Sequence, residues 1–221
     1  MARETFEENM KELEQELAGM GEMVIRAVNR AVEALKSRDK DEAARIVSDD
    51  LLINKKRWDI EEKCINLIAT QQPVATDLRE IIVLLNIITD LERIGDHAEG
   101  IAKIVIMLGD EPLVKPLVEI PRMAEKTADM IKRSLEAFAE RDAKTARTIC
   151  EQDDEVDKLY DQVYRELLTS MIEDPRTITR ATYLMWAAHN LERIADRVTN
   201  ICERTVFLVT GTMEEVGVSK Y

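Results

Sequence analysis

The sequence predicts an all-α protein made of two tandem three-helix bundles, and three observations support this fold class. The 221-residue chain is 45% hydrophobic and 34% charged but holds only 7 Gly and 5 Pro, a composition typical of helical proteins. Apolar residues recur every three or four positions, which is the period of an amphipathic helix. The second half of the chain also repeats the plan of the first half.

The repeat is clearest in two segments of eleven residues. LERIGDHAEGI, beginning at Leu91, returns as LERIADRVTNI from Leu191, with six of the eleven positions identical. Repeats of this kind indicate one structural unit used twice. We therefore expect a first repeat over residues 1–110 and a second over residues 111–221. Upstream of these segments the offset becomes 103, so that Glu33, Arg38, Asp39 and Asp50 match Glu136, Arg141, Asp142 and Asp153.

Three long helices are expected in the first repeat. An apolar stripe at spacings of three and four residues defines the first helix. Asp39 then stands where an N-cap of the second helix is needed. Pro73 breaks the helical pattern and marks a turn before the third helix. The expected helices therefore cover about Met10–Leu35, Asp41–Ala69 and Asp77–Leu108.

The second repeat follows a linker, Gly109–Pro116, that holds two of the five prolines. Three long helices joined by short turns pack as an up-down-up bundle. We expect Met20, Met123, Trp58 and Trp186 in the core or at its edge. The helices of the second repeat are expected at about Leu117–Glu140, Asp142–Glu173 and Thr177–Thr210.

Charge and composition exclude several classes of function. A formal net charge of −13 disfavours binding to nucleic acid or to anionic lipid. The first residues lack the apolar run of a signal peptide, and no uncharged stretch approaches the ~20 residues of a spanning helix. Cys64, Cys150 and Cys202 have no zinc-site spacing and are expected as small buried residues. These features indicate a cytoplasmic protein that does not insert into membranes.

Acidic residues spaced four apart are the strongest chemical signal. Such a pair lies on one helix face, one turn apart. Hairpins at Pro73 and Pro175 would bring the pairs on neighbouring helices to one height, because each pair lies a similar number of residues from its turn. The expected groups are Asp50, Asn54, Glu92 and Asp96 in the first repeat, and Asp153, Asp157, Glu192 and Asp196 in the second.

Four gathered carboxylates repel one another unless they are protonated, paired with Arg or bridged by a cation. Their oxygen atoms suit Mg, Mn, Ca or Fe. A solvated face paired with Arg57, Arg93 and Arg193 is the simpler alternative. His97 and His189 occupy non-equivalent positions, which argues against a di-iron oxidase centre. The sequence contains no catalytic motif of the nucleotide-binding or hydrolase type, so no catalytic residue is expected.

The segment QQPVATDLREIIVLLNIITDLERIGDHAEGIAK (Gln71–Lys103), its copy LERIADRVTNICE (Leu191–Glu203) and the two-bundle layout resemble the PhoU family of phosphate-uptake regulators. This resemblance implies two bundles with pseudo-twofold symmetry in a cytoplasmic, often dimeric protein. It further implies a negative regulator that represses the phosphate-starvation regulon when phosphate is plentiful. The implied partners are the ATPase subunit of the phosphate ABC transporter and the phosphate-sensor histidine kinase.

The resemblance also implies metal binding, because some members hold multinuclear clusters through E(D)xxxD pairs. Carried over by motif, these pairs fall on Asp153/Asp157 with Glu192/Asp196, and on Asp50 with Glu92/Asp96. Asn54 departs from the pattern. The implied ions are Fe, Mn, Mg or Zn, and no organic cofactor is expected.

Two other functions remain compatible with the residues. A carboxylate-bridged metalloenzyme would direct the ligands into a bundle core and show turnover. A purely structural helical scaffold would leave the carboxylates solvated. In the regulatory interpretation the bare protein binds phosphate poorly, because its acidic faces are anionic, and a bound cation is needed to attract it.

Overall fold

The computed structural model describes residues 2–215 and confirms the all-α class. No strand occurs within these described residues. Six helical segments account for the fold, one of them broken in two, and a short 3-10 turn, Pro175–Thr177, precedes the last. The helices are α1 (Ala2–Ser37), α2 (Lys40–Gln71), α3 (Thr76–Leu108), α4 (Glu119–Ala139), α5 (Ala143–Cys150), α6 (Asp153–Glu173) and α7 (Ile178–Thr210).

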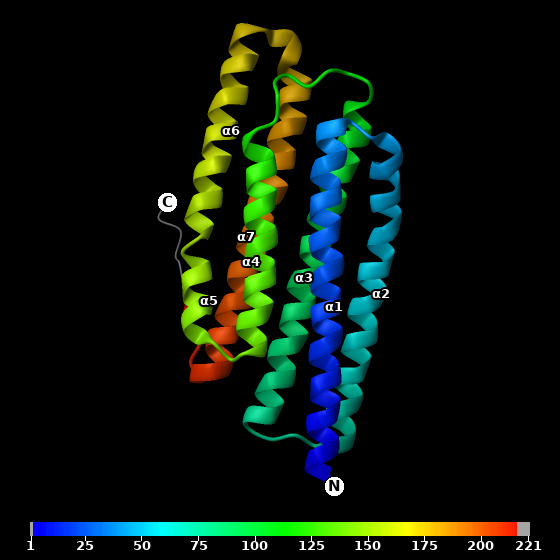
Figure 1. Cartoon of the computed structure of the whole chain (residues 1–221), viewed down its shortest axis with the longest axis vertical. Helices are drawn as coiled ribbons and strands as arrows, with labels where there is room; N and C mark the ends of the chain where they lie inside the picture. The colour runs from blue at the N-terminus through cyan, green and yellow to red at the C-terminus, as the bar shows by residue number, and fades with distance from the viewer. Residues whose placement is uncertain (1, 216–221) are drawn as a thin grey trace.

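The helices form two bundles that lie side by side along an elongated molecule (Figure 1). Helices α1, α2 and α3 pack together, and α4, α5 and α6 pack with α7. The bundles join where α3 lies against α7 and where α1 lies against α4. Helix α2 occupies one edge of the molecule, and α5 and α6 occupy the opposite edge. The predicted three-helix bundles are thus present.

Several predicted helix boundaries are confirmed in atomic detail. Asp39 caps α2, because its carboxylate accepts a hydrogen bond from the backbone N–H of Glu42 at 2.9 Å. Its counterpart Asp142 caps α5 by accepting from the N–H groups of Lys144 and Thr145, both at 3.0 Å. Helix α2 ends at Gln71, two residues beyond the predicted end at Ala69 and before the predicted break at Pro73.

One boundary is wrong: the helix expected over Asp142–Glu173 is broken after Cys150. The N–H of Gln152 bonds to the carbonyl of Ile149 at 3.0 Å, a tightened i−3 turn in place of the α-helical i−4 pattern. Neither Pro nor Gly causes this break. Instead, Cys150 is buried against α7 and the Gln152 side chain accepts from Arg133 Nη1 at 2.8 Å. The break lies directly before Asp153.

The apolar core is continuous through both bundles, and α3 and α7 supply much of it. Met20 and Met123 are fully buried, as expected, and the three cysteines are buried and free. The two tryptophans do not belong to the core: Trp58 is 59% exposed and Trp186 is 50% exposed. No helix in the described part of the chain is long and apolar enough to span a bilayer.

Polar groups lie between α3 and α7 in two sets that the repeat relates. Asp90 of α3 accepts from Asn200 Nδ2 at 3.3 Å and lies 3.5 Å from Arg197 Nη1, both on α7. At the related positions, Asn190 of α7 contacts His97 of α3, with Oδ1 and Nδ1 2.9 Å apart. An ion pair on one side thus corresponds to a neutral pair on the other. Burial raises the pKa of Asp90, against the opposing effects of Asn200 and Arg197, and burial lowers the pKa of His97.

Candidate carboxylate clusters

The first cluster lies between α2 and α3. Asp50 of α2 accepts a hydrogen bond from Asn54 Nδ2 at 2.8 Å, one turn further along the helix. Burial, followed by the charges of Glu99, Asp96 and Glu92, raises the pKa of Asp50 from 3.8 to about 6. The two predicted pairs of the first repeat therefore do come together across the α2–α3 hairpin.

Gly95 allows this close approach of the two helices. A Cβ atom added there would lie 3.2 Å from two carbons of Ile53 and 3.4 Å from Asp50 Oδ1. Any larger side chain would push α2 away from α3, since Ile53 is itself buried. The glycine between Glu92 and Asp96 is thus part of the geometry of the cluster.

The second cluster lies between α6 and α7. Burial, followed by the charges of Asp157, Asp196 and Glu192, raises the pKa of Asp153 from 3.8 to about 7. Burial and the charges of Asp196 and Asp157 raise the pKa of Glu192 from 4.5 to about 7, against the opposing effect of Arg193. All four predicted residues of the second repeat are therefore close together, and their charges are mutually unfavourable.

Two oxygen atoms of this cluster are buried without a hydrogen-bond partner: Asp153 Oδ1 and Glu192 Oε2. His189 Nδ1 lies 3.2 Å from Glu192 Oε2 but makes no hydrogen bond to it. A buried unpaired carboxylate oxygen is costly. The oxygen atoms are therefore the type of donor that a hard cation would bind.

Arginines pair with only part of each cluster. Arg93 lies 3.0 Å from Asp96 and 3.5 Å from Glu92, and Arg193 pairs with Asp196. Arg57 pairs instead with Glu61. As the side chains stand, no three Asp, Glu, His or Cys residues in the described chain converge tightly enough to hold one metal ion. The clusters bring suitable donors together without forming a closed coordination shell.

The clusters lie at the rim of each bundle. The side chains of Glu92 and Glu192 are 16% and 20% exposed, whereas those of Asp96 and Asp196 are 37% and 32% exposed. A ligand held there would therefore contact both the protein and solvent.

The structure adds two carboxylates that sequence spacing did not select. Glu99 contributes the largest single charge effect on Asp50, and Asp154 adds to the effect on Asp153. Glu99 follows Asp96 by three residues, one turn along the same face of α3. Its counterpart in the second repeat is Thr199, so a comparison of the two repeats for matching carboxylates does not find Glu99.

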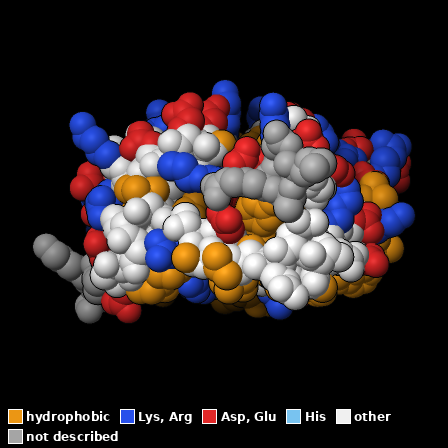
Figure 2. Space-filling model, turned by 90° about the horizontal axis from the view of Figure 1, so that it is seen from below, with side chains coloured by type: hydrophobic (Ala, Val, Ile, Leu, Met, Phe, Trp, Pro, Cys, Tyr) orange, Lys and Arg blue, Asp and Glu red, His pale blue; other side chains and the backbone are white. Residues whose placement is uncertain are grey.

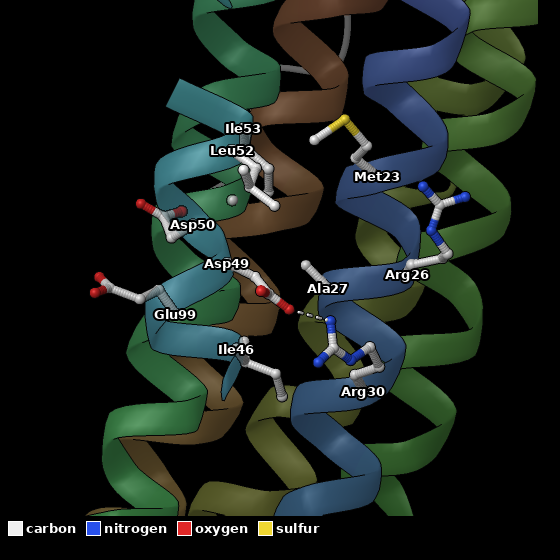
Figure 3. A pocket seen from close by; sticks show the side chains of 11 residues that line it. Met23, Arg26, Ala27, Arg30, Ile46, Asp49, Asp50, Leu52, Ile53 and Glu99 are labelled. Atoms are coloured by element: carbon white, nitrogen blue, oxygen red, sulfur yellow. Dashed lines mark hydrogen bonds and ion pairs between the residues drawn. The ribbon is translucent and has the colours of Figure 1, made fainter. Parts of the chain in front are cut away.

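The cavity next to the first cluster opens between α1 and α2 and has a volume of about 150 Å³ (Figure 3). The lining residues include Arg26 and Arg30 of α1, Asp49 and Asp50 of α2, and Glu99 of α3. Figure 3 shows Asp49 facing Arg30 across the gap, whereas the carboxylates of Asp50 and Glu99 point away from α1. Arg30 already pairs with Asp49 at 2.8 Å and with Glu42 at 2.6 Å. The cavity therefore borders the first cluster, and Arg30 on its wall is already paired with two carboxylates.

Comparison with known proteins gives a consistent result along nearly the whole chain. The family model described as the PhoU domain matches twice, at residues 17–105 and 120–205. A relative from Clostridium acetobutylicum, named phosphate-specific transport system accessory protein PhoU homolog, is 43% identical over 98% of this chain and 100% of its own length. A relative of the same name from Aquifex aeolicus is 40% identical over 91% of each chain.

Two solved structures share the fold. The phosphate transport system regulatory protein PhoU from Streptococcus pneumoniae superposes with a TM-score of 0.88 at 34% identity, covering 95% of this chain and 99% of that one. PhoU from Pseudomonas aeruginosa also gives a TM-score of 0.88, at 38% identity, covering 94% and 100%.

Proposed function

Because this chain belongs to the PhoU family, we propose that it is a regulatory accessory protein of phosphate transport that relays phosphate sufficiency. The relatives in Clostridium acetobutylicum and Aquifex aeolicus are named as transport accessory proteins, and the Streptococcus pneumoniae structure is titled a regulatory protein. Full-length similarity supports the same general role here. In this proposal the chain restrains uptake and the phosphate-starvation response.

The finer proposal is an adaptor role. The chain contacts the ATPase subunit of the phosphate ABC transporter and the phosphate-sensor histidine kinase, and it carries a signal between them. The elongated shape supports this proposal, because two partners can occupy separate regions of one rigid helical body (Figure 1). A net charge of −13 favours basic patches on those partners.

The carboxylate clusters are proposed to hold divalent or iron-type cations. One observation gives the main support for this cation binding. Asp153 and Glu192 each bury an oxygen atom that accepts no hydrogen bond, beside two more carboxylates, and both have pKa values raised to about 7. A cation would relieve both the repulsion and the missing hydrogen bonds. Asp153, Asp157, Glu192 and Asp196 would hold it in the second repeat, and Asp50, Asn54, Glu92, Asp96 and Glu99 in the first.

The clusters also suggest how phosphate could be sensed. Without a cation, the gathered carboxylates repel an anion, so the bare chain binds phosphate poorly. A bound cation supplies the positive charge that a phosphate oxygen can join as a further ligand. The partly exposed Asp96 and Asp196 lie at the solvent side, where such a ligand would enter.

A carboxylate-bridged enzyme is less well supported by the same geometry. Such an enzyme needs ligands directed into a bundle core, whereas these side chains lie at the bundle rims and are up to 37% exposed. The named relatives are accessory and regulatory proteins. The proposal is therefore non-enzymatic.

Affinity capture tests the adaptor role. The full chain, immobilised, is incubated with the purified transporter ATPase subunit and with the cytoplasmic part of the sensor kinase. The proposal expects both to be retained, and retention to change when phosphate and Mn²⁺ are added. Asp153→Asn with Glu192→Gln should reduce that phosphate response, while Glu173→Gln at the exposed end of α6 should preserve it. Failure to retain either partner under all conditions would refute the adaptor role.

A further inference from the structure

Aromatic side chains gather along the α6–α7 hairpin, next to the second carboxylate cluster. The rings of Tyr160 on α6 and His189 on α7 lie 6.0 Å apart between their centroids, and the rings of Tyr183 and Trp186 on α7 lie 5.6 Å apart. Tyr164 follows Tyr160 by one turn along α6. Together these side chains are called the aromatic strip.

Much of the aromatic strip is open to solvent. Trp186 is 50% exposed, Tyr164 is 43% exposed, and the side chain of His189 is 53% exposed. Figure 2, a view along the long axis, shows hydrophobic side chains that reach the surface among the charged ones, so a single exposed apolar residue carries no information about function. The strip differs because several large flat rings lie together on two neighbouring helices.

The first repeat shows that the fold does not require these rings. At the positions that the repeat relates to Tyr160, Tyr164, Trp186 and His189, the first repeat has Arg57, Glu61, Asn86 and Thr89. Arg57 and Glu61 pair with each other at 3.2 Å. The α2–α3 hairpin thus folds with polar residues that satisfy one another at these places, whereas the α6–α7 hairpin exposes aromatic rings. Grouped Tyr and Trp side chains of this kind are typical of surfaces that bind another protein.

The carboxylates beside the strip indicate the chemistry of the partner. Asp157 precedes Tyr160 by three residues and Glu192 follows His189 by three, so each carboxylate lies one turn from a ring. Among the described residues no Lys or Arg forms an ion pair with Asp157 or Glu192. A guanidinium group can stack on an aromatic face and donate to a carboxylate at the same time, which the compact ammonium group of Lys does less well. Rings flanked by carboxylates therefore suit an Arg side chain.

We propose that the aromatic strip is a docking surface for an arginine-bearing segment of a partner protein. The Arg side chain stacks on the exposed rings, and its guanidinium group pairs with Asp157 or Glu192. The net charge of −13 favours the approach of such a segment. This inference deepens the adaptor role and rests on it for the natural source of the segment. Because Asp157 and Glu192 also belong to the second cluster, a cation bound there would compete with the Arg side chain.

Fluorescence anisotropy of labelled peptides, measured with the full chain in the presence of a chelator, tests this surface. The probe is a short helical peptide with two Arg residues one turn apart, and its control has the neutral analogue citrulline in place of Arg. The Arg peptide is expected to bind with a Kd of about 10–100 μM, and the citrulline peptide at least about tenfold more weakly. A third peptide with Lys in place of Arg should bind more weakly than the Arg peptide.

Variants of the chain locate the binding on the strip. Trp186→Asn introduces the residue that the first repeat carries at the related position, and it should weaken binding of the Arg peptide at least about tenfold. Trp186→Phe retains a ring and should keep most of the affinity. The control Ile172→Asn, at a position 75% exposed near the end of α6, should leave binding unchanged.

Three results would overturn the proposal: no binding of the Arg peptide at about 1 mM, equal binding of the Arg and citrulline peptides, or binding that Trp186→Asn does not weaken. Because only peptides are used, the outcome does not depend on whether the ATPase subunit or the kinase is retained in affinity capture. The docking surface and the adaptor role can therefore fail separately.

Discussion

Asp153 on α6 and Glu192 on α7 each bury a carboxylate oxygen that accepts no hydrogen bond, and the charge of Glu192 raises the pKa of Asp153. Two helices that could have paired apolar residues at this height instead bring four carboxylates together. The arrangement costs stability in the bare protein. A bound cation would offset this cost. The proposal therefore predicts measurable changes in stability and in metal affinity.

The first prediction concerns the pH dependence of stability. The pKa of Asp153 is about 7 in the folded chain, against 3.8 normally. Between about pH 4 and about pH 7 the folded state therefore retains a proton that the unfolded state has released, so stability falls as the pH rises through this window. Above about pH 7 the cost of ionisation is constant. We expect Asp153→Asn to stabilise the metal-free protein at pH 8 by roughly 1–2 kcal/mol, allowing for solvent screening.

Thermal unfolding in chelator at pH 5 and pH 8 measures this effect. Glu173→Gln, a change at the exposed end of α6, serves as the control and should retain the wild-type pH dependence. If Asp153→Asn and the wild type respond identically to pH, the raised pKa has no energetic consequence and the interpretation fails.

The second prediction concerns Asn54, the one position where the first repeat lacks a carboxylate of the predicted pattern. Asn54→Asp adds a fifth carboxylate to the cluster of four that acts on and includes Asp50, and it removes the 2.8 Å hydrogen bond from Asn54 Nδ2 to Asp50. We expect the metal-free variant to be less stable and the first cluster to bind Mn²⁺ roughly tenfold more tightly, about 1.4 kcal/mol. Calorimetric titration on an Asp153→Asn background isolates the first cluster, and unchanged affinity would argue against cation binding there.

The third prediction concerns the contact at Gly95. Gly95→Leu would force α2 from α3, because even a Cβ would lie 3.2 Å from Ile53. We expect a loss of about 1–3 kcal/mol in the free energy of unfolding. Gly19→Ala on α1 is the control: a Cβ there meets nothing within 4 Å, so it should stabilise by up to about 1 kcal/mol. Chemical denaturation of both variants provides the comparison, and a neutral Gly95→Leu would contradict the close approach.

The fourth prediction concerns Arg141, which joins the two bundles. Its guanidinium donates to Glu14 of α1 at 2.8 Å and also pairs with Glu80 of α3. Arg141→Ala should cost about 1–3 kcal/mol, because it leaves the half-buried Glu80 without its partner. Arg38→Ala is a matched control, since Arg38 is the exposed counterpart in the first repeat and shares a positive φ of 61° against 55°. Equal losses in the two variants would mean that only backbone conformation matters.

The sequence predicted the helices and their pairing well, because helix ends and hairpins depend on local signals. The N-caps of α2 and α5 are Asp39 and Asp142, and α2 ends before Pro73, as the preferences of Asp and Pro predict. The break before Asp153 could not be predicted, since it depends on contacts of Cys150 and Gln152 with α7 and α4. Glu99 was missed for a similar reason, because its part in the cluster arises from the α2–α3 packing.

The sequence-based prediction that Trp58 lies in the core or at its edge was also wrong, because Trp58 is exposed. Periodicity indicates which helix faces are apolar but not which apolar face is buried within one chain. Helix α2 has two such faces, one packed around Ile60 and one carrying the exposed Trp58. Only the arrangement of the bundle distinguishes them.

The most direct test of the cation-binding proposal is calorimetric titration of the metal-free full chain with Mn²⁺ at about pH 7.5, above the pKa values of the second cluster. Wild type is predicted to bind Mn²⁺ in both repeats and to bind phosphate only after Mn²⁺ loading. Asp153→Asn with Glu192→Gln should lose the binding that belongs to the second repeat and retain the rest. Identical Mn²⁺ binding by the wild type and this double variant would contradict the account.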